Sequence, residues 1–287
     1  MKFRTGKTES TFAGNSIILK LKTILPITAA VLIVSITNPE YSEAQRTKSS
    51  QSAGEQRFAE KGLKDNRYFF YYINASISNL GSEEEKDIFK EAIQRDILAQ
   101  QLYMKFLFRE SFREVRASQE LLVRVYRKTI ANDIKLARQL LNEFAAEVIH
   151  SNCDRARLYL RLGYRDTENA SIEMIMSDHF RPTLYSMRLY KYIDALKRAK
   201  QARRYAFLAI TYIRADDPAF EPGRLSFNEL GELIENIPDS PDKKELYRTI
   251  HLDNYYRFKD EISFYDRIWM NPRLEEIPEY EEYLSIN

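Results

Sequence analysis

Residues 45–181 contain no proline and only four glycines, Gly54, Gly62, Gly81 and Gly163. Proline and glycine are the residues that most often end regular elements, so such a long stretch nearly free of them favours long helices. Apolar residues also recur at three- and four-residue steps from Ile88 to Val148, which is the helical period. We therefore predict an all-α fold, an elongated or bent bundle of long helices.

Capping residues predict where these helices begin and end. A first helix is expected over about residues 65–80, closed by Gly81, and Ser82 with Glu85 forms a capping box for the next. The apolar stripe then continues without a visible break, so one very long helix or two helices joined by a tight turn near residues 116–120 both fit. The polar segment 150–154 predicts an end and a restart.

Breakers become more frequent towards the C-terminus. Gly163 predicts the end of a short helix over residues 155–162, residues 166–169 cap another that reaches Phe180, and a regular helix runs from about Thr183 to before Asp216. Six prolines cut the C-terminal third into shorter helices, such as 226–236 and 242–270. We expect a flexible arm over 45–62, a long-helix domain over 63–214, and an acidic helical segment, 215–287, that packs on it.

The first 44 residues are typical of a secretory signal peptide. Five basic residues precede the short apolar run 24–36, and Ser42 and Ala44 supply a small-residue cleavage site. An uncleaved anchor is the alternative, but a span needs about 20 apolar residues. The long basic region leaves a later translation start open. We expect export to the periplasm and no stable membrane insertion after cleavage.

The single cysteine, Cys153, lies far from the predicted cleavage site. It therefore cannot carry a lipid anchor there, and one thiol cannot form an internal disulfide. We expect packing alone to stabilise the mature protein.

Charge is balanced overall but unevenly distributed. Residues 181–214 hold nine Lys or Arg and a single acid, whereas residues 215–287 hold 18 acidic and eight basic residues. Either the acidic segment folds back on the basic helix and neutralises it, or the two charged faces meet a partner or a second copy of the chain. A basic helix with tyrosines can bind nucleic acid, but the predicted export argues against that.

A dense aromatic cluster opens the first predicted helix. Its rings cannot all lie on one helical side, so either both sides are buried in the fold or some rings form a binding surface. Together with the basic helix it supplies the candidate protein-binding residues, namely Tyr68, Phe69, Phe70, Tyr71, Tyr72, Arg188, Lys191, Arg198, Arg203 and Arg204.

Signatures of catalysis and cofactor binding fail in this sequence. No two glycines of the mature chain are close enough to form a phosphate-binding loop, and no G-x-S-x-G motif occurs. The Glu147-x-x-His150 spacing lacks the second copy that a di-iron bundle needs, and His150 with Cys153 leaves a zinc site half filled. We expect no enzyme activity, cofactor or metal.

Four segments resemble the flagellar coiling proteins of leptospiral spirochaetes. They are NEFAAEVIH at 142–150, RLYLRLGYRD at 157–166, TLYSMRLYKY at 183–192 and RRYAFLA at 203–209. The resemblance implies an all-helical periplasmic protein that coats the flagellar filament core together with other sheath proteins and contributes to coiling and motility. It brings no catalytic or cofactor residue. The long basic leader and the proline-rich acidic tail leave open whether the chain is the sheath component or a paralogue.

Two functions of different classes follow. The first is a structural sheath component of the periplasmic flagellum, with self-association open. The second is a periplasmic binding or scaffold protein unrelated to flagella, in which the aromatic cluster holds a ligand.

Overall fold

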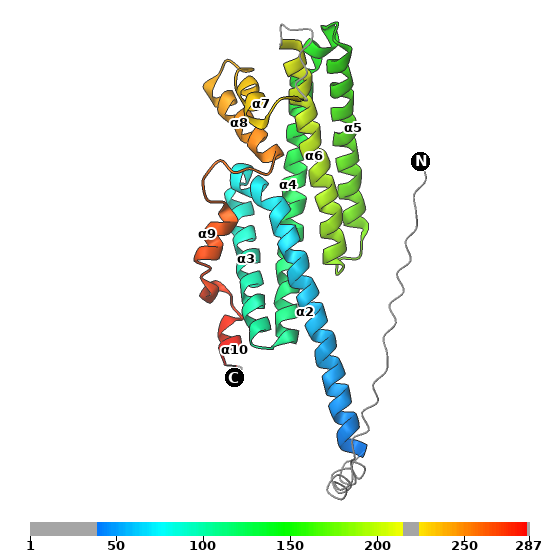
Figure 1. Ribbon diagram of the computed structural model, residues 1–287, viewed down its shortest axis with the longest axis vertical. Coiled ribbons are helices and arrows are strands. Elements are labelled where there is room, and N and C mark those ends of the chain that lie inside the picture. The colour runs from blue at the N-terminus through cyan, green and yellow to red at the C-terminus, as the bar shows by residue number, and fades with distance from the viewer. Residues whose placement is uncertain (1–38, 215–223, 286–287) are drawn as a thin grey trace, which may run out of the picture. The chain divides into compact units, whose positions relative to one another are not determined.

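The computed structural model describes residues 39–214 and 224–285, with side chains from residue 53 onward (Figure 1). The chain divides into two compact units, Met1–Gln51 and Ser52–Asn287. The predicted signal peptide, residues 1–44, lies outside the described residues except for positions 39–44, which begin helix α2 (Pro39–Leu80). All side chains discussed below belong to the second unit.

Four more long helices follow α2, namely α3 (Glu83–Met104), α4 (Phe108–His150), α5 (Asp154–His179) and α6 (Tyr185–Arg214). Helix α4 is central because it packs against α3, α5 and α6, and α5 and α6 lie side by side as a helical hairpin (Figure 1). No strand occurs within the described ranges. The prediction of an all-α bundle is confirmed.

Shorter helices follow in the C-terminal region, as the prolines predict. They are α7 (Phe227–Glu235), α8 (Pro241–Asn254), α9 (Phe264–Met270), the 3-10 helix η2 (Leu274–Glu276) and α10 (Tyr280–Leu284). Leu274, Ile277 and Tyr283 join the core that α2, α3, α4 and α6 form, while Leu230 and Ile250 join a second core around the C-terminal half of α4. Both cores thus contain residues of the C-terminal segment.

The turn after α3 lies at residues 105–107 and not near 116–120. Leu107 donates its backbone N–H to the Leu102 carbonyl at 3.0 Å, and Phe106 takes the left-handed position with φ of 62°. Glycine normally occupies this position, so the sequence gives no warning of the turn. Residues 116–120 stay helical because Ser118 and Gln119 are buried against neighbouring helices.

Helix α5 is continuous, although a break at Gly163 was predicted. Gly163 is buried, and a Cβ built there would lie 2.4 Å from Leu141 Cδ2 and 3.4 Å from the Ala202 carbonyl oxygen. Its glycine therefore permits close approach of α4 and α6 instead of ending a helix. The expected helix over 242–270 is in turn two helices, because the chain turns after α8 at Tyr256, with φ of 56°.

Helix α2 begins well before the predicted residue 65 and includes residues 45–62, which were predicted to form a flexible arm. Side-chain contacts explain its described part. Ala59 is buried, the rings of Phe58 and Phe112 lie 5.8 Å apart, and a Cβ on Gly62 would lie 2.5 Å from Val115 Cγ1. Packing on α4 thus favours the helix where composition alone favours a loop.

Candidate functional site

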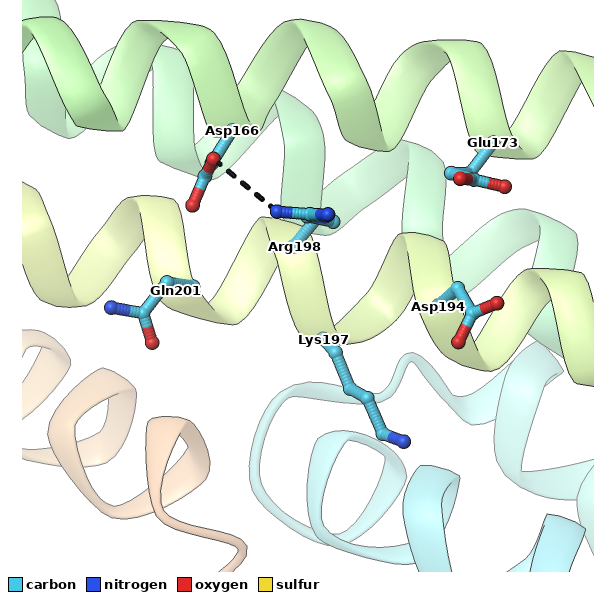
Figure 2. Close-up of a pocket in the computed structure, with 6 residues that line it drawn as sticks. All are labelled: Asp166, Glu173, Asp194, Lys197, Arg198 and Gln201. Carbon is cyan, nitrogen blue, oxygen red and sulfur yellow. Dashed lines mark ion pairs between the residues drawn. The ribbon is translucent and has the colours of Figure 1, made fainter.

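Helix α6 presents its cations to two different environments. Towards α5 they meet carboxylates. Lys191 Nζ lies 3.2 Å from Glu173, Arg188 lies 3.4 Å from Asp178, and Arg198 lies 3.7 Å from Asp166. Figure 2 shows Arg198 directed at Asp166, while the neighbouring Lys197 points to the other side of α6. We call the first side, Arg188, Lys191 and Arg198 with their carboxylates, the paired side.

On its other side α6 meets tyrosines. Lys197 Nζ lies 4.3 Å above the centre of the Tyr72 ring, Lys200 Nζ 4.5 Å above Tyr256, and the Arg204 guanidinium 4.5 Å above Tyr255. Cations are attracted to the electron-rich ring faces. We call this the aromatic side, comprising these three cations and their rings.

Lys197 remains a cation in this setting. Its partial burial on its own lowers the pKa of the ammonium, but the interactions with Tyr72 and Tyr68 more than offset that effect and raise the pKa. Among the described residues no carboxylate lies within ion-pair distance of Lys197. Its positive charge is therefore not cancelled by the fold.

Between the two sides a buried cluster of four charges fixes α6. Arg203 is fully buried, donates from Nη1 to Asp133 Oδ1 at 2.9 Å, and pairs through Nη2 with Asp253 of α8. Lys200 Nζ lies 2.7 Å from the same Asp253. Burial raises the pKa of Asp133 to about 6, whereas the two cations keep that of Asp253 below its ordinary value despite its burial. The cluster is balanced, with two charges of each sign.

The tyrosines of α2 and α6 meet at the surface. Tyr68 lies 5.6 Å from the Tyr190 ring and 4.8 Å from the Tyr72 ring, which in turn lies 5.1 Å from Tyr71. Tyr71 is 63% exposed, Tyr190 41% and Tyr68 38%. Partial burial and the hydrogen bond to Asp65 raise the pKa of Tyr190 to about 12, so this ring stays neutral. We call Tyr68, Tyr71, Tyr72 and Tyr190 the tyrosine surface.

The structure thus joins two groups that are more than 100 residues apart in the sequence, although not every predicted member is available at the surface. Phe69 and Phe70 are buried in the core, and Arg203 is buried in the ion cluster. Predicting these three as partner contacts is incorrect for this fold, because their side chains are already surrounded by the protein. Arg188, Lys191 and Arg204 are half-buried, and Arg198 is exposed.

The sequence left two alternatives for the basic helix, neutralisation by the acidic C-terminal segment or contact with a partner, and the geometry decides between them only in part. The C-terminal segment contributes Asp253 to the buried cluster, but the carboxylates of the paired side come from α5. The residues Asp253, Asn254 and Tyr256 were not among the predicted site residues. The run NYYR at 254–257 places tyrosines next to a basic residue, as α6 does. This is the local signal that could have indicated these residues.

No metal site is apparent among the described side chains, since no three His, Cys, Asp or Glu residues converge. Glu147 lies 3.2 Å from Arg214, and His150 Nδ1 contacts the Ala146 carbonyl at 2.7 Å. In the part of the chain that the structure describes, no helix combines the length and apolar character that crossing a membrane requires.

Comparison with known proteins gives one match. Residues 53–283 match the family model described as surface protein adhesin OmpL37. No curated protein and no solved structure matches the chain significantly. The matched family is not the flagellar coiling family that the four segments between residues 142 and 209 resemble. Because the match covers most of the sequence, the chain belongs to the OmpL37 surface protein adhesin family.

Proposed function

We propose that the protein is a non-enzymatic adhesin of the cell surface that binds a partner macromolecule through the tyrosine surface. The observation that carries this proposal is the exposure of three adjacent tyrosines, Tyr68, Tyr71 and Tyr190, beside Lys197, which has no ion pair among the described residues. Tyrosine combines a large apolar ring with a hydroxyl and loses little side-chain entropy on binding, which is why it is enriched in protein interfaces. Membership of an adhesin family supports the same role.

The test is a binding assay with a matched pair of triple variants. Tyr68→Ser, Tyr71→Ser and Tyr190→Ser together should lower binding to immobilised extracellular-matrix proteins at least tenfold, measured by biolayer interferometry. The control removes a similar apolar area from α5 through Ile172→Ser, Ile175→Ser and Met176→Ser, which are 47–52% exposed. Equal loss in both variants, or none in the tyrosine variant, would count against the tyrosine surface.

Location is tested separately. Protease added to intact cells should remove the protein if it is displayed at the cell surface, whereas a periplasmic marker should survive the same treatment. Survival of the protein alongside that marker would instead support the periplasmic location expected from the leader.

A flagellar-sheath role is the second candidate. It is favoured by exposed apolar side chains in and between the segments that resemble flagellar coiling proteins. Met187 lies in the segment 183–192, and Ile172, Ile175 and Met176 lie between the segments 157–166 and 183–192. Such residues suit packing against neighbouring sheath subunits. Mass spectrometry of purified flagella tests the idea, and absence of the protein from the filaments would exclude it. In that case the α5 triple variant should also leave motility unchanged.

A further inference from the structure

A hollow of about 280 Å³ lies on the aromatic side of α6, between α2, α6 and the end of α8. Three cations, Lys197, Lys200 and Arg204, line it together with the rings of Tyr72 and Tyr256. The left-handed backbone at Tyr256 places this ring under Lys200, 5.6 Å from the Tyr72 ring. Such a backbone costs a non-glycine residue about 1 kcal/mol or more, so the fold maintains this wall despite its cost.

Two buried polar groups at the hollow have no hydrogen-bond partner among the described residues. Asn254 is only 3% exposed, and neither its Nδ2 nor its Oδ1 forms a hydrogen bond. The Nε of Arg204 is likewise buried without an acceptor. An unsatisfied buried polar group costs about 1–3 kcal/mol, and native folds contain few of them. A ligand that accepts hydrogen bonds would satisfy both donors.

The charge of the hollow selects the sign of that ligand. Lys200 is neutralised by Asp253 behind it, but Lys197 and Arg204 face rings instead of carboxylates. Among the described residues that line the hollow, none carries a carboxylate. The lining therefore has an excess of positive charge in a partly desolvated setting, where charge-assisted hydrogen bonds are strongest.

We propose that this hollow binds an acidic sugar, with a sulfate or carboxylate held by Arg204, Lys197 and the Asn254 amide. The walls argue for a sugar because the rings of Tyr72 and Tyr256 add apolar contact area next to the cations that lie over them, and Asn254 Oδ1 offers an acceptor for a hydroxyl. The inference deepens the proposed adhesin role. It rests on that role only for the location of the glycan, at the surface to which the protein would adhere.

The test uses the full mature chain and isothermal titration calorimetry. The ligands are a fully sulfated heparin disaccharide, an unsulfated uronate disaccharide, lactose and inorganic sulfate. At least one acidic disaccharide should bind at least tenfold more tightly than sulfate ion, and lactose should not bind. Equal affinity for inorganic sulfate would overturn the assignment to a sugar, and the absence of acidic-disaccharide binding at millimolar concentration would overturn the site.

Variants locate the binding. Arg204→Gln and Asn254→Asp should each weaken the disaccharide at least tenfold, the second because it adds a carboxylate to the hollow. The matched control is Arg198→Gln, which removes a neighbouring cation that already has Asp166 as its partner. Should Asn254→Asp fail to fold by circular dichroism, the half-buried Arg204 still decides the question. Unchanged affinity in Arg204→Gln, or equal loss in Arg198→Gln, would overturn the proposal.

The triple tyrosine variant separates this inference from the proposed function. It leaves Arg204 and Asn254 in place, so it should keep disaccharide binding while losing the protein partner. Retained protein binding in that variant, together with disaccharide binding that still requires Arg204, would refute the tyrosine surface and leave the sugar site standing.

Discussion

The paired side and the aromatic side of α6 differ in how they neutralise cations of the same helix. On the paired side Arg188, Lys191 and Arg198 each have a carboxylate on α5 within 4 Å. On the aromatic side Lys197 and Arg204 have rings in that place. A carboxylate cancels the charge, whereas a ring only attracts it and leaves the cation able to bind an anion.

The difference teaches that the cations of one basic helix can have different roles on its different sides. Its paired side is a structural seam between two helices, and its aromatic side keeps net positive charge at a tyrosine-rich edge. The buried cluster around Arg203 separates the two and holds α6 against α4 and α8. Four predictions test this division, beginning with the largest effect.

Arg203→Ala should destabilise the protein by about 3–5 kcal/mol, because it leaves Asp133 and Asp253 buried with one cation between them. The measurement is urea denaturation followed by circular dichroism. Arg198→Ala is the control from the paired side. It removes an exposed pair and should cost no more than about 1 kcal/mol. A cost within 1 kcal/mol of this control would mean that the buried cluster does not anchor α6.

Asp133→Asn should change how stability depends on pH. The folded pKa of Asp133, about 6, lies above the unfolded value near 3.9, so the folded state binds the extra proton between these pH values. The contribution of Asp133 to wild-type stability should therefore fall as pH rises through that window, by up to about 3 kcal/mol. The variant lacks this loss, so its melting temperature relative to wild type should increase from pH 4 to pH 7. A constant difference across that range would contradict the raised pKa.

Gly163→Ala should lower the free energy of unfolding of the protein by about 1 kcal/mol, because Gly163 lies where α5 closely approaches α4 and α6. Overpacking against the buried Leu141 costs about 1–3 kcal/mol, and the better helix propensity of alanine returns about 1 kcal/mol. Gly54→Ala is the matched control, because a Cβ there meets nothing within 4 Å, and it should be neutral or slightly stabilising. Thermal melts of both variants give the comparison, and stabilisation by Gly163→Ala would show that the helices are not in close contact there.

Lys191→Ala and Lys197→Ala should each cost less than about 1 kcal/mol, but they should respond differently to salt. The Lys191–Glu173 pair is partly solvent-accessible and is screened by ions. Its contribution should shrink in 1 M sodium chloride, while that of Lys197 over the tyrosine rings should change less. Equal salt dependence of the two variants in denaturant titrations would contradict the prediction that an ion pair and a cation over a ring respond differently to salt.

Local signals in the sequence predicted much of the helical framework. Ser82 caps α3 with the expected capping box, and the 150–154 segment separates α4 from α5. Ser226, at the start of the helix predicted over 226–236, also forms a capping box at α7. Boundaries failed where an aromatic residue took a position usual for glycine, at Phe106 and Tyr256. They also failed where a glycine served packing, at Gly163. In each case the contacts of other helices outweighed the local preference.

The sequence by itself determined the helical class, the concentration of bases in α6 and the aromatic richness of α2, because periodicity and composition are local properties. Only the tertiary structure decided which of those cations lie beside carboxylates and which lie beside aromatic rings. Arg203 finds its carboxylates 70 and 50 positions away, on α4 and α8, and Lys197 meets Tyr72 from α2. Coulomb attraction depends on distance in space, and the rotation of each helix in the bundle sets that distance.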